Sequence, residues 1–218
     1  MTGLQKGLLI AAVSFVVLVG ACSAGFYFRI YKPYASPMMA MVMGKALEDS
    51  QLKTKEFVKP GSGELDADEV RRFVSVEDSV DAAIAGATAV LAEQQTALEK
   101  SADGGSLPLK AAFGPFGVIK DVLMNGKRAQ ITAMNREHLS KREFEWVRDQ
   151  LYRAAGFPLT RIDTSQLTGG GRDGGDSEGP TLRLRTLRAE EVPPANQALA
   201  LPIKSKLEAW RAFAFFGL

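Results

Sequence analysis

The chain has 218 residues, 46% of them hydrophobic and 24% charged, and its 27 basic and 25 acidic side chains leave a net charge of +2. These proportions are typical of a globular protein, and they provide no basic field that would favour nucleic acid as a partner. The single cysteine excludes an intramolecular disulfide, a zinc site built on several cysteines and a CxxC redox pair. We therefore expect one domain behind one N-terminal apolar segment.

The first feature along the chain is an apolar stretch from Leu8 to Phe28 that contains no charged residue. Its length matches the roughly 20 residues that a helix needs to cross a bilayer. Aromatic and basic side chains then mix as they do where a helix ends among lipid headgroups. The sequence therefore predicts a membrane anchor over residues 1–34, a single-pass uncleaved helix, with these interface residues: Tyr27, Phe28, Arg29, Tyr31, Lys32 and Tyr34.

Two alternatives remain open for this segment. Small residues from Val19 to Ala21 precede Cys22 as they do in a lipoprotein signal, which makes Cys22 a candidate lipid-attachment site, and an ordinary cleaved signal peptide has a similar layout. Flanking charges differ too little to decide the orientation. The short tail before the apolar run and the near absence of cysteine favour a domain on the exported, periplasmic-like side of the membrane.

Residues 35–63 are predicted to form a juxtamembrane helix and a linker. Four methionines lie within six residues, and thioethers are ligands that suit Cu(I). Methionine also fills irregular interfaces, and no histidine or cysteine stands nearby to complete a metal site. We favour the packing interpretation and expect no metal or cofactor, with these residues as fillers: Met38, Met39, Met41 and Met43.

A helical domain is predicted over residues 64–160. Asp66 and Glu69 have the spacing of a capping box, and an apolar stripe at helical spacing continues from Val70 to Leu98, interrupted by Glu77 and Gln94. The pattern predicts one long helix that ends before Gly104. Its stripe is either a core face or a seam for self-association, and it consists of Val70, Phe73, Val80, Ile84, Ala87, Leu91 and Leu98.

Two further helices are expected after Pro108. Gly114 and Pro115 should delay the start of the first helix. Ser140 and Glu143 have the spacing of a second capping box, and Gly156 provides a stop signal. The sole histidine, His138, has no recognisable nucleophile or orienting partner, so we interpret it as structural or solvent-exposed.

Residues 161–192 are predicted to be a disordered glycine-rich loop followed by a short extended segment. The run TGGGRDGGDSEGP has neither the strand and GK[ST] ending of a phosphate-binding loop nor the spacing of a calcium loop. Leucine and arginine then alternate from Leu182 to Arg188, which indicates an extended segment with a basic face. Contact of these arginines with anionic lipid headgroups is an alternative.

A C-terminal helix is predicted over residues 193–218. Its end is too apolar to remain in water, so these side chains must be buried in the domain, against the membrane or in a partner. Burial in the domain is the simplest interpretation, and docking to a partner is the alternative. The side chains concerned are Trp210, Phe213, Phe215 and Phe216.

The sequence as a whole predicts an all-α protein, in which a membrane-spanning helix is followed by a helical-bundle-like domain of about four helices. No catalytic, metal-binding or nucleotide-binding constellation is visible. We therefore expect a non-enzymatic envelope protein that scaffolds or modulates a membrane-associated complex, with the membrane and a protein, or a second copy, as partners. The alternative is an apolar-ligand or lipid-binding module with a pocket between its helices.

Overall fold

The computed structural model describes residues 44, 46–53, 56–102, 106–163, 181–187 and 192–218. This part of the chain is mostly helical, which confirms the predicted fold class at that level. The predicted anchor over residues 1–34 lies outside the described residues, as do the four methionines that follow it. Within the described residues, no helix combines the length and apolar character needed to cross a bilayer.

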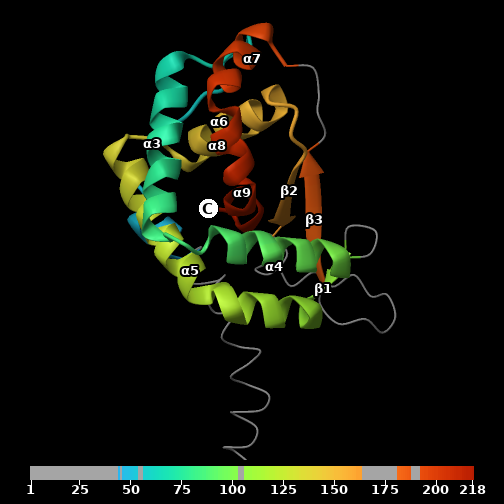
Figure 1. The fold of residues 1–218 in the computed structure, drawn as a ribbon. Helices are drawn as coiled ribbons and strands as arrows, with labels where there is room; N and C mark the ends of the chain where they lie inside the picture. The colour runs from blue at the N-terminus through green and yellow to red at the C-terminus, as the bar shows by residue number, and fades with distance from the viewer. Residues whose placement is uncertain (1–43, 45, 54–55, 103–105, 164–180, 188–191) are drawn as a thin grey trace, which may run out of the picture.

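The predicted long helix is in fact two helices, α3 (Ala67–Ala83) and α4 (Thr88–Ser101). The predicted capping box begins α3, since Asp66 accepts from the amide of Glu69 and the Glu69 carboxylate accepts from the amide of Asp66. The break falls at Gly86, which adopts a φ of +81° that other residues rarely take. In Figure 1 the two helices run in different directions. The prediction of one long helix with a single straight seam from Val70 to Leu98 is therefore wrong.

The apolar stripe of these two helices faces the interior of the same chain. Most of its members are buried there, including Phe73, Val80 and Leu91, so their side chains are already covered. Self-association through Val70 to Leu98 stays a prediction, but it would have to use other side chains of these helices. The core also draws on α5 and α6, which pack against α3.

The helix α5 (Leu109–Arg136) begins before Gly114 and Pro115, so the predicted delay is wrong. A proline in the second turn removes one amide donor from the helical ladder. This first part of α5 packs against α4 and β1 (Ser106–Pro108), and such tertiary contacts override local propensity. Further along, α5 lies beside α3 (Figure 1). The helix α5 therefore contacts both α4 and α3.

The boundaries of α6 (Lys141–Ala154) follow the sequence closely. The Ser140 hydroxyl accepts from the amide of Glu143 at 3.1 Å, as predicted. The Glu143 carboxylate pairs with Arg72 of α3, so it does not serve as the second half of the predicted capping box. At the other end Gly156 has a φ of +77°, and the amides of Gly156 and Phe157 bond back to the carbonyls of Arg153 and Tyr152. This is the Schellman arrangement that terminates a helix.

A small antiparallel sheet accompanies the helices, with strand order β1-β3-β2. The predicted extended segment corresponds to β3 (Thr181–Leu187), whereas β1 and β2 (Leu159–Asp163) were not predicted. Leu159 opposes Leu187, and Arg161 opposes Arg185. The glycine-rich run between β2 and β3 lies outside the described residues.

The predicted C-terminal helix is divided into short consecutive pieces. These are α7 (Pro194–Ala200), the 3₁₀ turn η3 (Leu201–Ile203), α8 (Lys204–Ala209) and α9 (Arg211–Phe216). They descend through the middle of the domain between α3 and the sheet (Figure 1), and α9 contacts α4 and β2. Trp210, Phe213 and Phe215 are buried in this core, and Phe216 is partly buried. The first three are therefore core residues here, not exposed docking side chains.

Replacing Phe213 with alanine tests this core role. Phe213→Ala removes a fully buried ring, so it should lower the free energy of unfolding by about 3–5 kcal/mol. Leu201→Ala is the matched control, because Leu201 belongs to the same C-terminal run and is 71% exposed. Urea denaturation should show little change for Leu201→Ala. Equal effects of the two substitutions would contradict the core assignment.

A second substitution tests the structural interpretation of His138. His138 is exposed and takes a left-handed φ of 55° where α5 ends, with the Leu139 amide bonded to the Met134 carbonyl. Because glycine adopts this conformation without strain, His138→Gly should raise the free energy of unfolding by up to about 1 kcal/mol. His138→Ala keeps the strain and serves as the comparison. A lower urea midpoint for the glycine variant than for the alanine variant would contradict this role.

Candidate functional site

The most unusual chemistry in the described residues is a set of polar side chains buried between α3 and α6. Glu77 of α3 is 1% exposed, and Arg148 and Tyr152 of α6 are 2% and 1% exposed. Arg148 and Tyr152 are four residues apart, so they lie on the same face of their helix. The Arg148 guanidinium also lies 5.6 Å from the centre of the Phe144 ring. A carboxyl group, a guanidinium and a phenol are thus buried together in the interior of the domain.

Burial controls the protonation of Glu77. Loss of hydration raises the pKa of this carboxyl to about 8, although the positive charges of Arg148 and Lys127 act in the opposite direction. Burial likewise raises the pKa of the Tyr152 hydroxyl, and the nearby Glu77 adds to that effect. Oε2 of Glu77, Nε of Arg148 and the Tyr152 hydroxyl make no hydrogen bond to any described residue. A carboxyl with a pKa of about 8 exchanges its proton slightly above neutral pH.

Lys127 of α5 joins three parts of the chain on the edge of this cluster. Its ammonium donates to Glu48 Oε1 at 2.7 Å, to Gln130 Oε1 at 2.7 Å and to the carbonyl of Gly217. Glu48 belongs to a short helical segment, residues 46–51, and Lys141 of α6 binds its second carboxylate oxygen. Arg148 donates to the carbonyl of Leu218 at 3.2 Å. The start and the end of the described chain are therefore fastened to the same helices.

Electrostatics around Lys127 reflect this arrangement. Burial lowers the pKa of the Lys127 ammonium, and pairing with Glu48 opposes the shift. For Glu48, burial is the largest single effect and acts to raise the pKa, but pairing with Lys127 and Lys141 together outweighs it, so the pKa of this carboxyl is lowered. The pairing of Glu48 with the two lysines thus offsets the cost of burying these groups.

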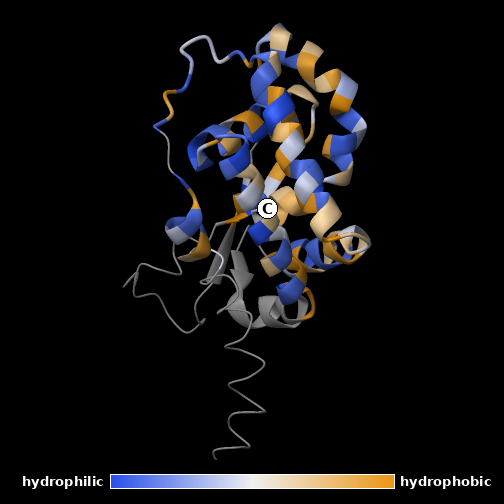
Figure 2. Ribbon diagram, turned by 90° about the vertical axis from the view of Figure 1, so that its left-hand side faces the viewer, coloured by the Kyte–Doolittle hydropathy of each residue, from blue (hydrophilic) through white to orange (hydrophobic). Residues whose placement is uncertain are grey.

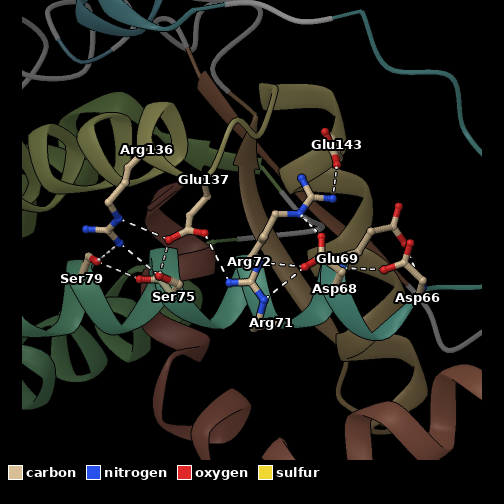
Figure 3. A network of polar contacts seen from close by, with 10 residues as sticks. All are labelled: Asp66, Asp68, Glu69, Arg71, Arg72, Ser75, Ser79, Arg136, Glu137 and Glu143. Atoms are coloured by element: carbon tan, nitrogen blue, oxygen red, sulfur yellow. Dashed lines mark hydrogen bonds and ion pairs between the residues drawn. The ribbon is translucent and has the colours of Figure 1, made fainter.

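A second polar network lies nearer the surface, where α3 meets α5 and α6 (Figure 3). Arg72 bridges Asp68 on its own helix and Glu143 on α6, each at 2.9 Å. Glu137, after the end of α5, accepts from Ser75 at 2.7 Å and from Arg136 at 3.2 Å. The hydrogen bond from Ser75 is the main reason that the pKa of Glu137 is lowered. The contacts here are between protein groups, and their role is to hold the three helices together.

Most of the site residues that the sequence predicted lie outside the described residues. The candidate lipid site Cys22 and the interface residues from Tyr27 to Tyr34 lie outside the described residues. The calcium and phosphate-loop alternatives also fall outside them, in residues 168–180. In the described part of the chain, no three histidine, cysteine, aspartate or glutamate side chains are grouped as metal ligands.

Sequence reasoning found part of the buried cluster and missed the rest. Glu77 stood out as a charged residue inside an apolar stripe. Arg148 carried the same signal, because it lies between Val147 and Leu151 on the apolar face of α6, but it was not recognised. Glu48 and Lys127 are separated by 79 positions in the sequence and carry no local signal.

Comparison with known proteins gives no assignment, since no protein-family model, curated protein or solved structure matches this chain. The fold and the buried cluster therefore have to be interpreted from their own chemistry.

Replacing Glu77 with glutamine tests the buried acid. An acid whose pKa is raised on folding contributes stability below its unfolded pKa of 4.5, and this stability is lost as the pH rises toward 8. Glutamine has the shape of the neutral acid and does not titrate. The stability gained in Glu77→Gln should therefore grow between pH 5 and pH 8 and reach roughly a few kcal/mol.

Urea denaturation at several pH values measures this difference. Glu93→Gln is the control for loss of one surface charge, because Glu93 is exposed on α4. Parallel stability profiles for the wild-type chain and Glu77→Gln would show that Glu77 does not hold its proton in the folded state.

Proposed function

We propose that this chain is a single-pass membrane protein whose helical domain acts as a non-enzymatic scaffold for a membrane-associated complex. The observation that carries the proposal is the attachment of residues 46–51 to the domain through Glu48, Lys127 and Lys141. This short helical segment follows the predicted anchor. A docked juxtamembrane segment keeps a domain nearer to the bilayer than a free linker does.

The composition of the site supports a scaffold more than an enzyme. The polar groups described above pair mainly with one another or lie buried in the core, and an enzyme needs reactive groups that a substrate can reach. The function expected of such a domain is to present its outer surface to other membrane components. On this proposal the domain lies on the exported side of the membrane.

The anchor is tested by fractionation of the full chain. The protein should remain in membranes after a high-salt wash, retain Met1 and fractionate unchanged as Cys22→Ser, because an apolar helix needs no lipid to stay in a bilayer. Mass spectrometry of the intact chain identifies its first residue. A mature protein that begins with acylated Cys22 would contradict the uncleaved helix.

The scaffold role is tested separately by affinity capture from native membranes in mild detergent. Stoichiometric recovery of other membrane proteins supports the scaffold. Recovery of bound lipid without protein, from a chain washed free of bulk membrane, would instead support the apolar-ligand alternative.

The orientation of the domain is measured on Val58→Cys in a Cys22→Ser background. Val58 is 81% exposed, so its thiol would react with a membrane-impermeant maleimide only when the reagent is on the same side of the membrane as the domain.

A further inference from the structure

The chain before the start of α3 lies at the edge of the domain, and a small number of side-chain contacts hold it there. We define the arm as residues 46–53 and 56–59. Figure 2 shows this part of the chain running along the outside of the domain, from the helical residues 46–51 toward the start of α3. Several of its side chains are exposed, among them Gln51, Lys53 and Val58. An element with so little buried surface opens at a lower free energy than the core.

Leu52 of the arm packs against the core, and three further contacts, each of a different chemical kind, hold the described residues of the arm. Lys127 and Lys141 bind the Glu48 carboxylate. Asn135 of α5 accepts from the amide of Lys53 and donates to the carbonyl of Gln51, both at 2.9 Å. The Phe57 ring lies 5.4 Å from the Trp146 ring of α6. The surface of α5 and α6 thus contacts a carboxylate, the main chain at the end of a helical turn and an aromatic ring, in that order.

The arm is followed by an exposed turn, and the chain just after this turn is hydrogen-bonded to the domain. Residues 60–63 form a turn, in which the Gly63 amide bonds to the Pro60 carbonyl. A methyl group added at Gly61 would meet no other part of the protein within 4 Å, so the turn is open to solvent. Asn196 then fastens the other side, because it accepts from the Leu65 amide at 2.8 Å and donates to the Gly63 carbonyl at 3.0 Å. Movement of the arm at this turn would leave the start of α3 bonded to Asn196.

We infer that the arm of one copy binds the α5–α6 surface of a second copy, in exchange for the arm that this surface holds in its own chain. The second copy is the partner that the surface fits, because it supplies the same carboxylate, main-chain segment and ring in the same order. Exchange forms no new kind of contact, so its cost is mainly the opening of the turn at residues 60–63 and the loss of the independence of two copies. The inference does not depend on the membrane anchor.

Cross-linking between two differently tagged full-length chains tests the exchange. One chain carries Phe57→Cys and the other Trp146→Cys, both in a Cys22→Ser background, and the chains are coexpressed and treated with a short bismaleimide. Exchange brings the two thiols together across copies, so an adduct that carries both tags is expected. Val118→Cys paired with Leu201→Cys is the control for random collision, because these residues are 66% and 71% exposed and lie elsewhere.

The adduct should exceed that of the control pair by roughly tenfold, since exchange replaces a collision with a fixed proximity. A single chain that carries both Phe57→Cys and Trp146→Cys reports the arm bound in its own chain. Adduct within this chain, with no excess between chains over the control, would overturn the exchange.

An independent measurement uses the unmodified full chain and a fluorescent peptide of residues 46–59. The peptide should bind, and binding should weaken at least several-fold in Lys141→Gln and Asn135→Ala, which remove the carboxylate and main-chain contacts. Glu48→Gln in the full chain loosens the competing arm and should strengthen binding of the unmodified peptide. Absence of binding to both the unmodified chain and Glu48→Gln would also overturn the inference.

Discussion

The packing of α3 and α6 encloses a carboxyl group and a guanidinium in the core, Glu77 and Arg148. Glu77 and Arg148 interrupt two otherwise apolar stripes, and removing either polar group from water carries a cost in free energy. Burial shifts Glu77 toward its neutral form, so the helices meet at the cost of a retained proton. Burial of these groups is therefore no evidence of added stability.

Other segments of the domain meet near these two buried side chains. α5 brings Lys127 to the edge of the cluster, where its ammonium binds both Glu48 and the Gly217 carbonyl. The C-terminal helices then fill the centre, and the methyl groups of Leu218 lie where Gly126 leaves room for them. A side chain at Gly126 would meet Leu218 at 2.8 Å. Segments far apart in the sequence are therefore fitted to one another at a few shared positions.

The sequence allowed prediction of features whose causes are local. The caps at Asp66 and Ser140 and the stop at Gly156 need only neighbouring residues, and all three are present. The break at Gly86 was missed because the apolar spacing continues across it. The strands β1 and β2 were missed because they are short and pair with a distant segment. Charged pairs such as Glu48 with Lys127 depend on tertiary structure, so periodicity carries no information about them.

Two asparagine side chains that bond to the main chain before α3 are open to deamidation, a common form of chemical ageing. Asn135 and Asn196 each contact the chain as an amide, with the oxygen accepting from an N–H and the nitrogen donating to a carbonyl two residues earlier. Deamidation keeps the acceptor but replaces the donor with a second oxygen, which then faces a carbonyl oxygen. Loss of one amide group would thus turn an attractive contact into a repulsive one. Deamidation at either asparagine would therefore weaken the hold on the chain before α3.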